Sequence, residues 1–198
     1  MRWLILIFAF LFGAFPTGYI VVWVLKRINI QTVGSGNIGS TNVGRVAGKG
    51  PALLTQAVDV VKGFLPTLLA ILYNRAHPAP YFVEITALLT ILGHDFTPYL
   101  LFRGGKGVNT TFGAFLSLFP IAGIIAFVSH LLVRKTLRIV SVASMIAGFV
   151  FCASATLIYG WSTATLALTI AFGILLFQHR ANLVRLAKNQ EPREAPKK

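Results

Sequence analysis

Long apolar runs separated by short polar gaps dominate the chain. A helix needs about 20 predominantly apolar residues to cross a hydrocarbon core of about 30 Å. Six runs approach or exceed this length, at residues 3–25, 51–73, 81–102, 108–133, 139–158 and 162–178. The pattern predicts an all-α integral membrane protein in which residues 1–188 form a single polytopic membrane domain.

Pro120 decides how many crossings we expect. Proline disrupts a helix interior, so the 108–133 run is either one crossing or two helices of roughly 12–14 residues, each reaching only about 20 Å. With the break, the chain has seven transmembrane helices, some of them short. Only this count places the basic gaps at 26–50, 103–107 and 134–138 on the same side as the C-terminal segment.

That common side would hold fifteen of the eighteen Lys and Arg residues. Cytoplasmic loops are enriched in Lys and Arg, so we expect this side to be cytoplasmic, with the N-terminus outside and the C-terminus cytoplasmic. In a bacterium the protein would then be a multi-pass protein of the cytoplasmic (inner) membrane. Residues 189–198 are polar and contain two prolines, and this composition predicts a disordered C-terminal tail.

The charge balance narrows the choice of partners. Eighteen basic residues against five acidic ones give a net charge of +13, which favours anionic partners such as nucleic acid, acidic lipid or phosphorylated metabolites. The basic residues lie in short gaps between apolar runs, where membrane lipid and small anions can reach them, so we do not expect nucleic acid to bind. Cys152 is the only cysteine, which excludes an intrachain disulfide.

The first polar gap contains the sequence GSGNIGSTNVGR, residues 34–45. Its glycines let the backbone bend tightly and expose N–H groups, while hydroxyl, amide and guanidinium groups add further donors. We therefore expect an anion cradle, and its candidate phosphate-binding residues are Gly34, Gly36, Asn37, Thr41, Asn42 and Arg45, with Ser35 beside them. The alternative is a mobile polar loop between two spans. A dinucleotide fingerprint is rejected because no strand precedes the motif.

A second glycine motif, RGGKGV, occupies residues 103–108. It opens directly into a predicted helix near Val108, so the N–H groups and the lysine of Gly104, Gly105, Lys106 and Gly107 would face a bound phosphate. The alternative is a flexible turn that carries the charges of a cytoplasmic loop. A Walker motif is excluded because Gly107 stands where Ser or Thr is required.

Three further sets of polar residues stand out near the ends of the apolar runs or inside them. His179 and Asn182, in the sequence HRANLVRL, share one helix face and can present an imidazole and an amide together, although an interfacial belt of basic residues is the alternative. Asp59 and Lys62 lie three residues apart within a span and are either functional or a mutually satisfied pair. His94 and Asp95 end the third run and are expected to brace the 103–107 loop.

Metal and cofactor chemistry is not expected. No pair of carboxylates is spaced to hold Mg²⁺, and no His or Cys cluster suits zinc. No histidine is followed by an aspartate five positions later, so the His-x-x-x-x-Asp arrangement used by one class of acyltransferases is absent. We expect neither a metal nor a cofactor.

Four motifs in order carry a family resemblance: GSGNIGSTNVGR at 34–45, DVVKG at 59–63, GHDFTPYLLFRGGKGV at 93–108 and HRANLVRL at 179–186. Together they make the chain resemble the bacterial membrane acyl-phosphate:glycerol-3-phosphate acyltransferases, the PlsY family. The resemblance implies seven helices, active-site loops at the cytoplasmic face, and synthesis of 1-acyl-glycerol 3-phosphate from acyl phosphate and glycerol 3-phosphate for phospholipid synthesis. No obligatory protein partner is inferred.

By the same resemblance, the functional positions are Ser35, Arg45, the Gly104–Gly107 loop, and His179 with Asn182. We expect Lys106, Arg45, Ser35 and loop N–H groups to neutralise phosphate and developing negative charge. His179 would take the hydroxyl proton or position the hydroxyl, and the substrate phosphate is the alternative base. A Ser35 acyl-enzyme is not favoured. An anion channel or transporter is the rival function, but it would place its binding groups near the midplane within inverted repeats.

Overall fold

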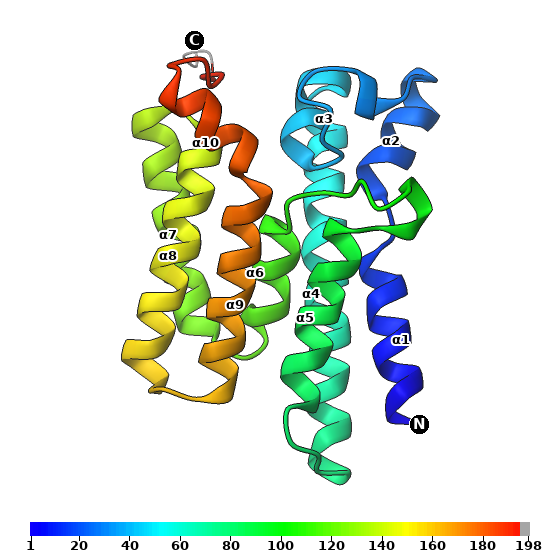
Figure 1. Ribbon diagram of the computed structural model, residues 1–198, viewed down its shortest axis with the longest axis vertical. Helices are drawn as coiled ribbons and strands as arrows, with labels where there is room; N and C mark the ends of the chain where they lie inside the picture. Colours follow the sequence, from blue (N-terminus) through cyan, green and yellow to red (C-terminus); the bar gives the residue numbers. More distant parts are fainter. Residues whose placement is uncertain (195–198) are drawn as a thin grey trace. The chain divides into compact units, whose positions relative to one another are not determined.

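The computed structural model describes residues 1–194, and every regular element in that range is a helix (Figure 1). The prediction of an all-helical chain is therefore confirmed. The helices fall into two compact units, Met1–Ser117 and the chain from Leu118 onward. The predicted tail at 189–198 falls partly on residues 195–198, which lie outside the described residues.

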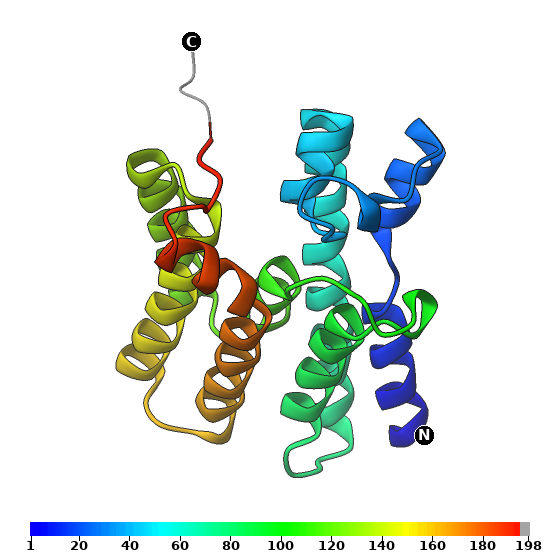
Figure 2. The same cartoon turned by 45° about the horizontal axis from the view of Figure 1, so that its top comes forward.

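The first unit contains six α-helices and two short 3-10 helices. They are α1 (Arg2–Gly13), α2 (Thr17–Lys26), η1 (Ile30–Thr32), α3 (Ser40–Ala47), α4 (Lys49–Ala76), α5 (Phe82–Asp95), η2 (Pro98–Leu100) and α6 (Val108–Leu116). The run predicted at 3–25 is split into α1 and α2 because the chain leaves the helix at Ala14 and Pro16 caps the next one. Between α5 and α6 the chain extends outward and returns, as Figures 1 and 2 show.

The second unit contains α7 (Pro120–Leu137), α8 (Val140–Tyr159), α9 (Thr163–Gln178) and α10 (Arg180–Ala187). A left-handed residue, Arg138 with φ 58°, closes the turn between α7 and α8. Helix α9 starts with a reciprocal capping box, in which the Ser162 and Thr165 side chains each bond the other residue's backbone N–H. Such a box satisfies two N–H groups that the helix itself leaves without acceptors.

The predicted break at Pro120 is confirmed, since α6 ends at Leu116 and α7 begins at Pro120. The expected lengths are wrong: α6 has 9 residues and α7 has 18. Helix α7 is longer because it continues past the apolar run, through Arg134 and Lys135. Basic side chains at such a helix end can reach water while their stems cover apolar surface.

Four segments are long and apolar enough to cross a membrane: Arg2–Lys26, α4, α7 and α8. A fifth is reached if α9 and α10, bent by 54° at their junction, count as one span. These segments identify a membrane protein. Helices α5 and α6, with 14 and 9 residues, are shorter than the roughly 20 residues of a full crossing.

Glycines let two helix pairs in the first unit approach to backbone contact. The relevant distance is the one between a hypothetical Cβ on each glycine and the nearest carbonyl oxygen of the facing helix. Between α1 and α5 the distances are 2.1 Å for Gly13 to Thr90 and 2.1 Å for Gly93 to Phe10. Between α4 and α6 they are 2.1 Å for Gly63 to Thr110 and 2.0 Å for Gly113 to Val60. Any side chain would force the helices apart, so both crossings depend on glycine.

Candidate active site

The first glycine motif forms a turn that one asparagine holds closed. Gly34 and Gly36 have positive φ values of 62° and 70°, which glycine adopts without strain. The buried Asn42 side chain accepts the Ser35 N–H at 2.9 Å and donates to the Val33 carbonyl at 3.0 Å. Its amide is thus engaged with the loop backbone, which supports a bracing role rather than direct contact with phosphate.

Helix α3 begins inside this motif, at Ser40. Asn37 Oδ1 accepts the Gly39 N–H at 2.8 Å, which shapes the entry to the helix. The first N–H groups of an α-helix have no acceptor within the helix, so they point outward from its N-terminus. Thr41 and Arg45 lie one turn apart on α3, and both are exposed together with Ser35. The motif therefore presents hydroxyl and backbone donors at the start of α3, and the Arg45 guanidinium belongs to the last turn of the same helix.

The second glycine motif is held by the end of α5. The Gly104 N–H donates to the Asp95 carbonyl at 3.2 Å, and the Gly105 N–H donates to the His94 carbonyl at 3.0 Å. Gly107, with φ 69°, caps the N-terminus of α6. The predicted bracing of this loop by His94 and Asp95 is therefore confirmed.

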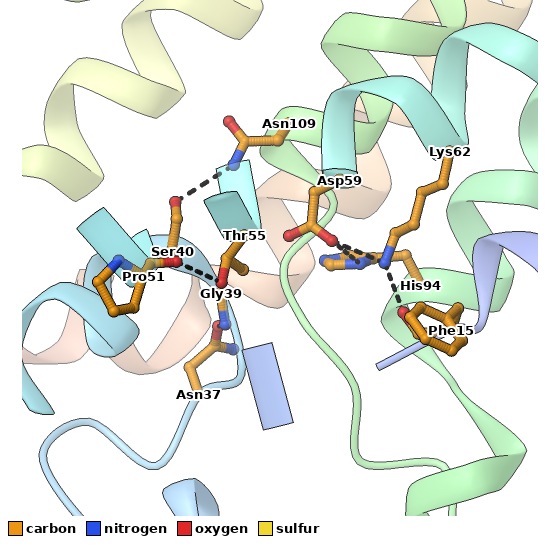
Figure 3. Close-up of polar contacts among 10 residues, drawn as sticks. All are labelled: Phe15, Asn37, Gly39, Ser40, Pro51, Thr55, Asp59, Lys62, His94 and Asn109. Carbon is orange, nitrogen blue, oxygen red and sulfur yellow. Dashed lines mark hydrogen bonds and ion pairs between the residues drawn. The ribbon is translucent and has the colours of Figure 1, made fainter. Parts of the chain in front are cut away.

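Two side-chain hydrogen bonds hold the regions of the two glycine motifs together, each joining a residue of one motif to a residue that flanks the other. Gln31 Nε2 donates to the Arg103 carbonyl at 2.8 Å. Asn109 Nδ2 donates to Ser40 Oγ at 3.3 Å (Figure 3), and these residues belong to the first turns of α6 and α3. Two helix N-termini, each following a glycine turn, therefore meet in one polar region. Helix N-termini attract anions through their exposed N–H groups and their dipoles.

A buried ion pair lies on α4 within the same unit. Lys62 Nζ is 2.8 Å from Asp59 Oδ1 and also donates to the Phe15 carbonyl at 2.9 Å, at the break between α1 and α2. His94 Nδ1 is 3.9 Å from the same Asp59 oxygen (Figure 3). The Asp59 and Lys62 side chains thus satisfy each other, and Lys62 also ties α4 to the broken first span.

His179 lies in the second unit, where α9 bends into α10. The side chain is buried, and its Nδ1 is 2.8 Å from the Leu175 carbonyl oxygen. A carbonyl can only accept, so Nδ1 carries the hydrogen and the ring's lone pair is on Nε2. The bend gives His179 a defined ring orientation and tautomer, as a proton acceptor requires.

Asn182 is oriented by a carboxylate that the sequence analysis missed. Glu191 accepts hydrogen bonds from Asn182 Nδ2 at 2.5 Å, Ser141 Oγ at 2.7 Å and Arg185 Nε at 2.7 Å. Burial alone would raise the pKa of the Glu191 carboxyl, but these hydrogen bonds and the Arg185 charge outweigh it and hold that pKa below its ordinary value. Glu191 is therefore an ionised anchor at neutral pH.

The fold and these sites define a helical membrane protein with a cationic, amide-rich site suited to phosphorylated ligands. Within residues 1–194, no group of three or more His, Cys, Asp or Glu residues is placed to hold a metal ion. The first unit brings together the candidates from both glycine motifs. His179 and Asn182 belong to the second unit.

Comparison with known proteins identifies the family. The family model described as "Glycerol-3-phosphate acyltransferase" matches residues 3–189. The glycerol-3-phosphate acyltransferase of Clostridium acetobutylicum is 41% identical over 187 residues, covering 92% of this chain and 94% of the relative. The enzyme of the same name from Synechococcus elongatus is 40% identical, covering 96% and 92%. The chain therefore belongs to the glycerol-3-phosphate acyltransferase family, of the PlsY type.

Solved structures agree with this assignment. The crystal structure of PlsY (YgiH), an integral membrane glycerol 3-phosphate acyltransferase, in its glycerol 3-phosphate form matches with a TM-score of 0.90 and 30% identity, covering 98% of this chain and 96% of that one. The lysophosphatidic acid form of that protein matches with a TM-score of 0.87 and 28% identity, covering 98% and 95%. The resemblance stated from the four motifs is confirmed.

Proposed function

We propose that this glycerol-3-phosphate acyltransferase takes its acyl group from acyl phosphate and transfers it to the 1-hydroxyl of glycerol 3-phosphate. The products are 1-acyl-glycerol 3-phosphate, which is lysophosphatidic acid, and inorganic phosphate. The observation that carries the proposal is the meeting of two glycine motifs at the N-termini of α3 and α6, linked by Asn109 and Ser40. Two substrates that each bear a phosphate require this concentration of donors. Crystal forms of the related PlsY with glycerol 3-phosphate and with lysophosphatidic acid support the choice of substrate and product.

In the proposed reaction, the hydroxyl oxygen of glycerol 3-phosphate attacks the acyl carbonyl carbon. A new ester C–O bond forms, the C–O bond to phosphate breaks, and phosphate leaves with the bonding electron pair. Arg45, Lys106 and Ser35, together with the N–H groups of the glycine loops, stabilise the substrate phosphates and the negative charge on the carbonyl oxygen. Phosphate is already a good leaving group, so positioning and charge neutralisation supply most of the catalysis.

The hydroxyl proton goes to Nε2 of His179 or to the substrate's own phosphate. The hydrogen bond from Nδ1 to the Leu175 carbonyl supports the first route because it directs the lone pair to Nε2. Asn182, held by Glu191, would orient the hydroxyl or the acyl carbonyl. Turnover of His179→Ala with both substrates saturating separates the routes. A loss of about 10²-fold or more fits a general base, whereas a near-normal rate assigns the proton to phosphate.

The deciding test of the function uses purified protein in detergent or in liposomes. Palmitoyl phosphate and radiolabelled glycerol 3-phosphate should give labelled lysophosphatidic acid, while acyl-CoA and acyl carrier protein thioesters should not replace the acyl phosphate. Lys106→Met should remove most of this activity, and Lys188→Met is a matched control because Lys188 lies outside the proposed site. If acyl phosphate gives no product and a thioester does, the proposed donor is wrong.

We also propose that residues 1–188 form one polytopic domain of the bacterial inner membrane. It would have seven crossings, the N-terminus outside and the glycine motifs facing the cytoplasm. The short α5 and α6 support this count, because half-length helices are tolerated where other helices surround them. Single cysteines test the topology in a Cys152→Ser background. Lys135→Cys should resist an impermeant maleimide applied to intact cells, and Arg75→Cys should react with it.

A further inference from the structure

The ring of His94 lies directly beneath the second glycine motif. A hypothetical Cβ on Gly105 would be 1.9 Å from His94 Nε2, 2.6 Å from Cε1 and 2.8 Å from Cδ2, and these are the three nearest atoms. The backbone of Gly105 therefore lies against the Nε2 end of the imidazole ring. The Gly105 N–H also donates to the His94 carbonyl, so one residue of α5 holds this glycine through both its backbone and its side chain.

The opposite edge of the ring faces the buried ion pair. His94 Nδ1 is 3.9 Å from Asp59 Oδ1, and that oxygen is 2.8 Å from Lys62 Nζ. Asp59, Lys62 and His94 are each no more than 4% exposed. Figure 3 shows the imidazole lying beside the Asp59 carboxylate and the Lys62 ammonium. The ring is thus enclosed between α4 and the glycine loop, and it cannot move without displacing one of them.

We propose that His94 is a positioning residue for substrate phosphate. Its ring supports Gly105 from below, and the Asp59–Lys62 pair fixes the ring. The Gly104 and Gly105 N–H groups are used to attach the loop to α5, so the held loop presents Lys106 and the N–H groups that follow Gly105 to the phosphate. This inference rests on the proposed function, in which that loop binds the phosphate of one of the two substrates. His94 itself does not touch the substrate or take part in proton transfer.

The mechanical reason lies in the glycines. A loop with three glycines in four residues has many conformations open to it, and ordering each backbone residue costs conformational entropy. A loop ordered before the substrate arrives avoids this cost during binding. Two backbone hydrogen bonds order Gly104 and Gly105, and the imidazole closes the space into which Gly105 would otherwise move.

The test is a size exchange between His94 and Gly105. Gly105→Ala should raise the KM for one of the two substrates about tenfold or more, with kcat changed less than about threefold. His94→Ala should raise the KM for the same substrate. In the double variant, His94→Ala makes room for the new methyl group, so its KM should be close to that of His94→Ala alone rather than the product of the two effects.

Gly104→Ala provides the matched control. Its Cβ would meet backbone atoms, the His94 carbonyl oxygen at 2.1 Å and the Asp95 carbonyl oxygen at 2.6 Å. Removing the His94 side chain cannot relieve these contacts, so His94→Ala should not rescue Gly104→Ala. His94→Asn serves as a second partner for Gly105→Ala if His94→Ala is poorly folded, because it keeps a polar group near Asp59 and removes Nε2 and Cε1.

The outcomes separate the inference from the proposed function. If the wild-type protein forms no lysophosphatidic acid, the proposed function fails. The positioning role is overturned if the wild type is active but neither His94→Ala nor His94→Asn restores the KM of Gly105→Ala. It is also overturned if these two substitutions restore the KM of Gly104→Ala as well as they restore that of Gly105→Ala. A fall in kcat without a change in either KM also overturns it, because a loop that only binds phosphate acts on substrate affinity. Selective rescue of Gly105→Ala, with the effect confined to one KM, supports it.

Discussion

Gly63 offers a direct test of how closely α4 and α6 are packed. A Cβ added there would lie 2.1 Å from the Thr110 carbonyl oxygen and 2.9 Å from the Ala114 backbone nitrogen. Carbon and oxygen atoms normally approach to about 3.3–3.6 Å, so Gly63→Ala requires a separation of more than about 1 Å. The facing atoms are backbone, so no change of rotamer can supply it.

The expected cost follows from overpacking. Forcing extra carbon into a packed site destabilises by about 1–3 kcal/mol, partly offset by the better helix propensity of alanine, up to about 1 kcal/mol. Gly50 is the matched control because it lies in the same helix and a Cβ there meets nothing within 4 Å. Gly50→Ala should therefore be neutral or slightly stabilising.

The assay is thermal unfolding of the purified variants in one detergent. One kcal/mol corresponds to about 2–4 °C for a chain of this size, so a net cost of about 2 kcal/mol would make Gly63→Ala melt about 4–8 °C below wild type. It should also lose activity, because α6 carries the Gly104–Gly107 loop at its N-terminus. A Gly63→Ala protein as stable and as active as Gly50→Ala would refute the backbone contact.

Three further predictions concern stability. Glu191→Gln should lower the Tm at neutral pH, and the Tm difference from wild type should shrink on acidification. The folded-state pKa of Glu191 is lowered, so its carboxylate stabilises the fold above the ordinary pKa of 4.5, and this contribution is lost as pH falls through the folded-state pKa. A Tm difference that persists unchanged at pH 3 contradicts this. Lys62→Met leaves the Asp59 charge buried and should cost about 3–5 kcal/mol, and adding Asp59→Asn should recover part of that loss in the same melting assay. Ser162→Ala removes a helix cap and should cost about 0.5–2 kcal/mol without changing KM, whereas a change in KM would show that the cap also affects the site.

The apolar runs predicted most of the long helices because hydrophobic length is a local property of the sequence. They did not predict the division of the first run, although the residues Pro16, Thr17 and Gly18 stand at that point. Gly18 is required there because its Cβ would lie 1.9 Å from the Ile38 carbonyl oxygen, a contact with a distant segment. Pro16 marks a point where the helix can break, but whether the chain breaks there depends on packing against distant segments.

Helix α3 shows a different limit of sequence reasoning. Gly44 and the β-branched residues give Ser40–Ala47 little intrinsic preference for a helix, and we predicted no helix within this polar gap. Its helix is stabilised by a buried cluster of Val22, Ile30, Ile38 and Val43. Packing against residues up to about twenty positions earlier outweighs local propensity.

The candidate site shows the same division between local and long-range information. Glycine and donor content identified both anion motifs, but the link between Ser40 and Asn109 spans 69 residues. Glu191 was overlooked because it lies in a polar segment, and Ser141, one of its partners, is 50 residues away. Residue types point to the chemistry, whereas the pairs that orient those residues depend on the fold.

The ion pair of α4 has a consequence for the order of assembly. Asp59 and Lys62 are three residues apart in one helix, so their contact can form as soon as α4 is helical, and the segment can enter the bilayer with its charges already matched. The bond from Lys62 to the Phe15 carbonyl, 47 residues away, requires the first span to be alongside. Local charge matching can therefore come first in biogenesis, and the lysine then becomes the anchor that fixes the broken first span against α4.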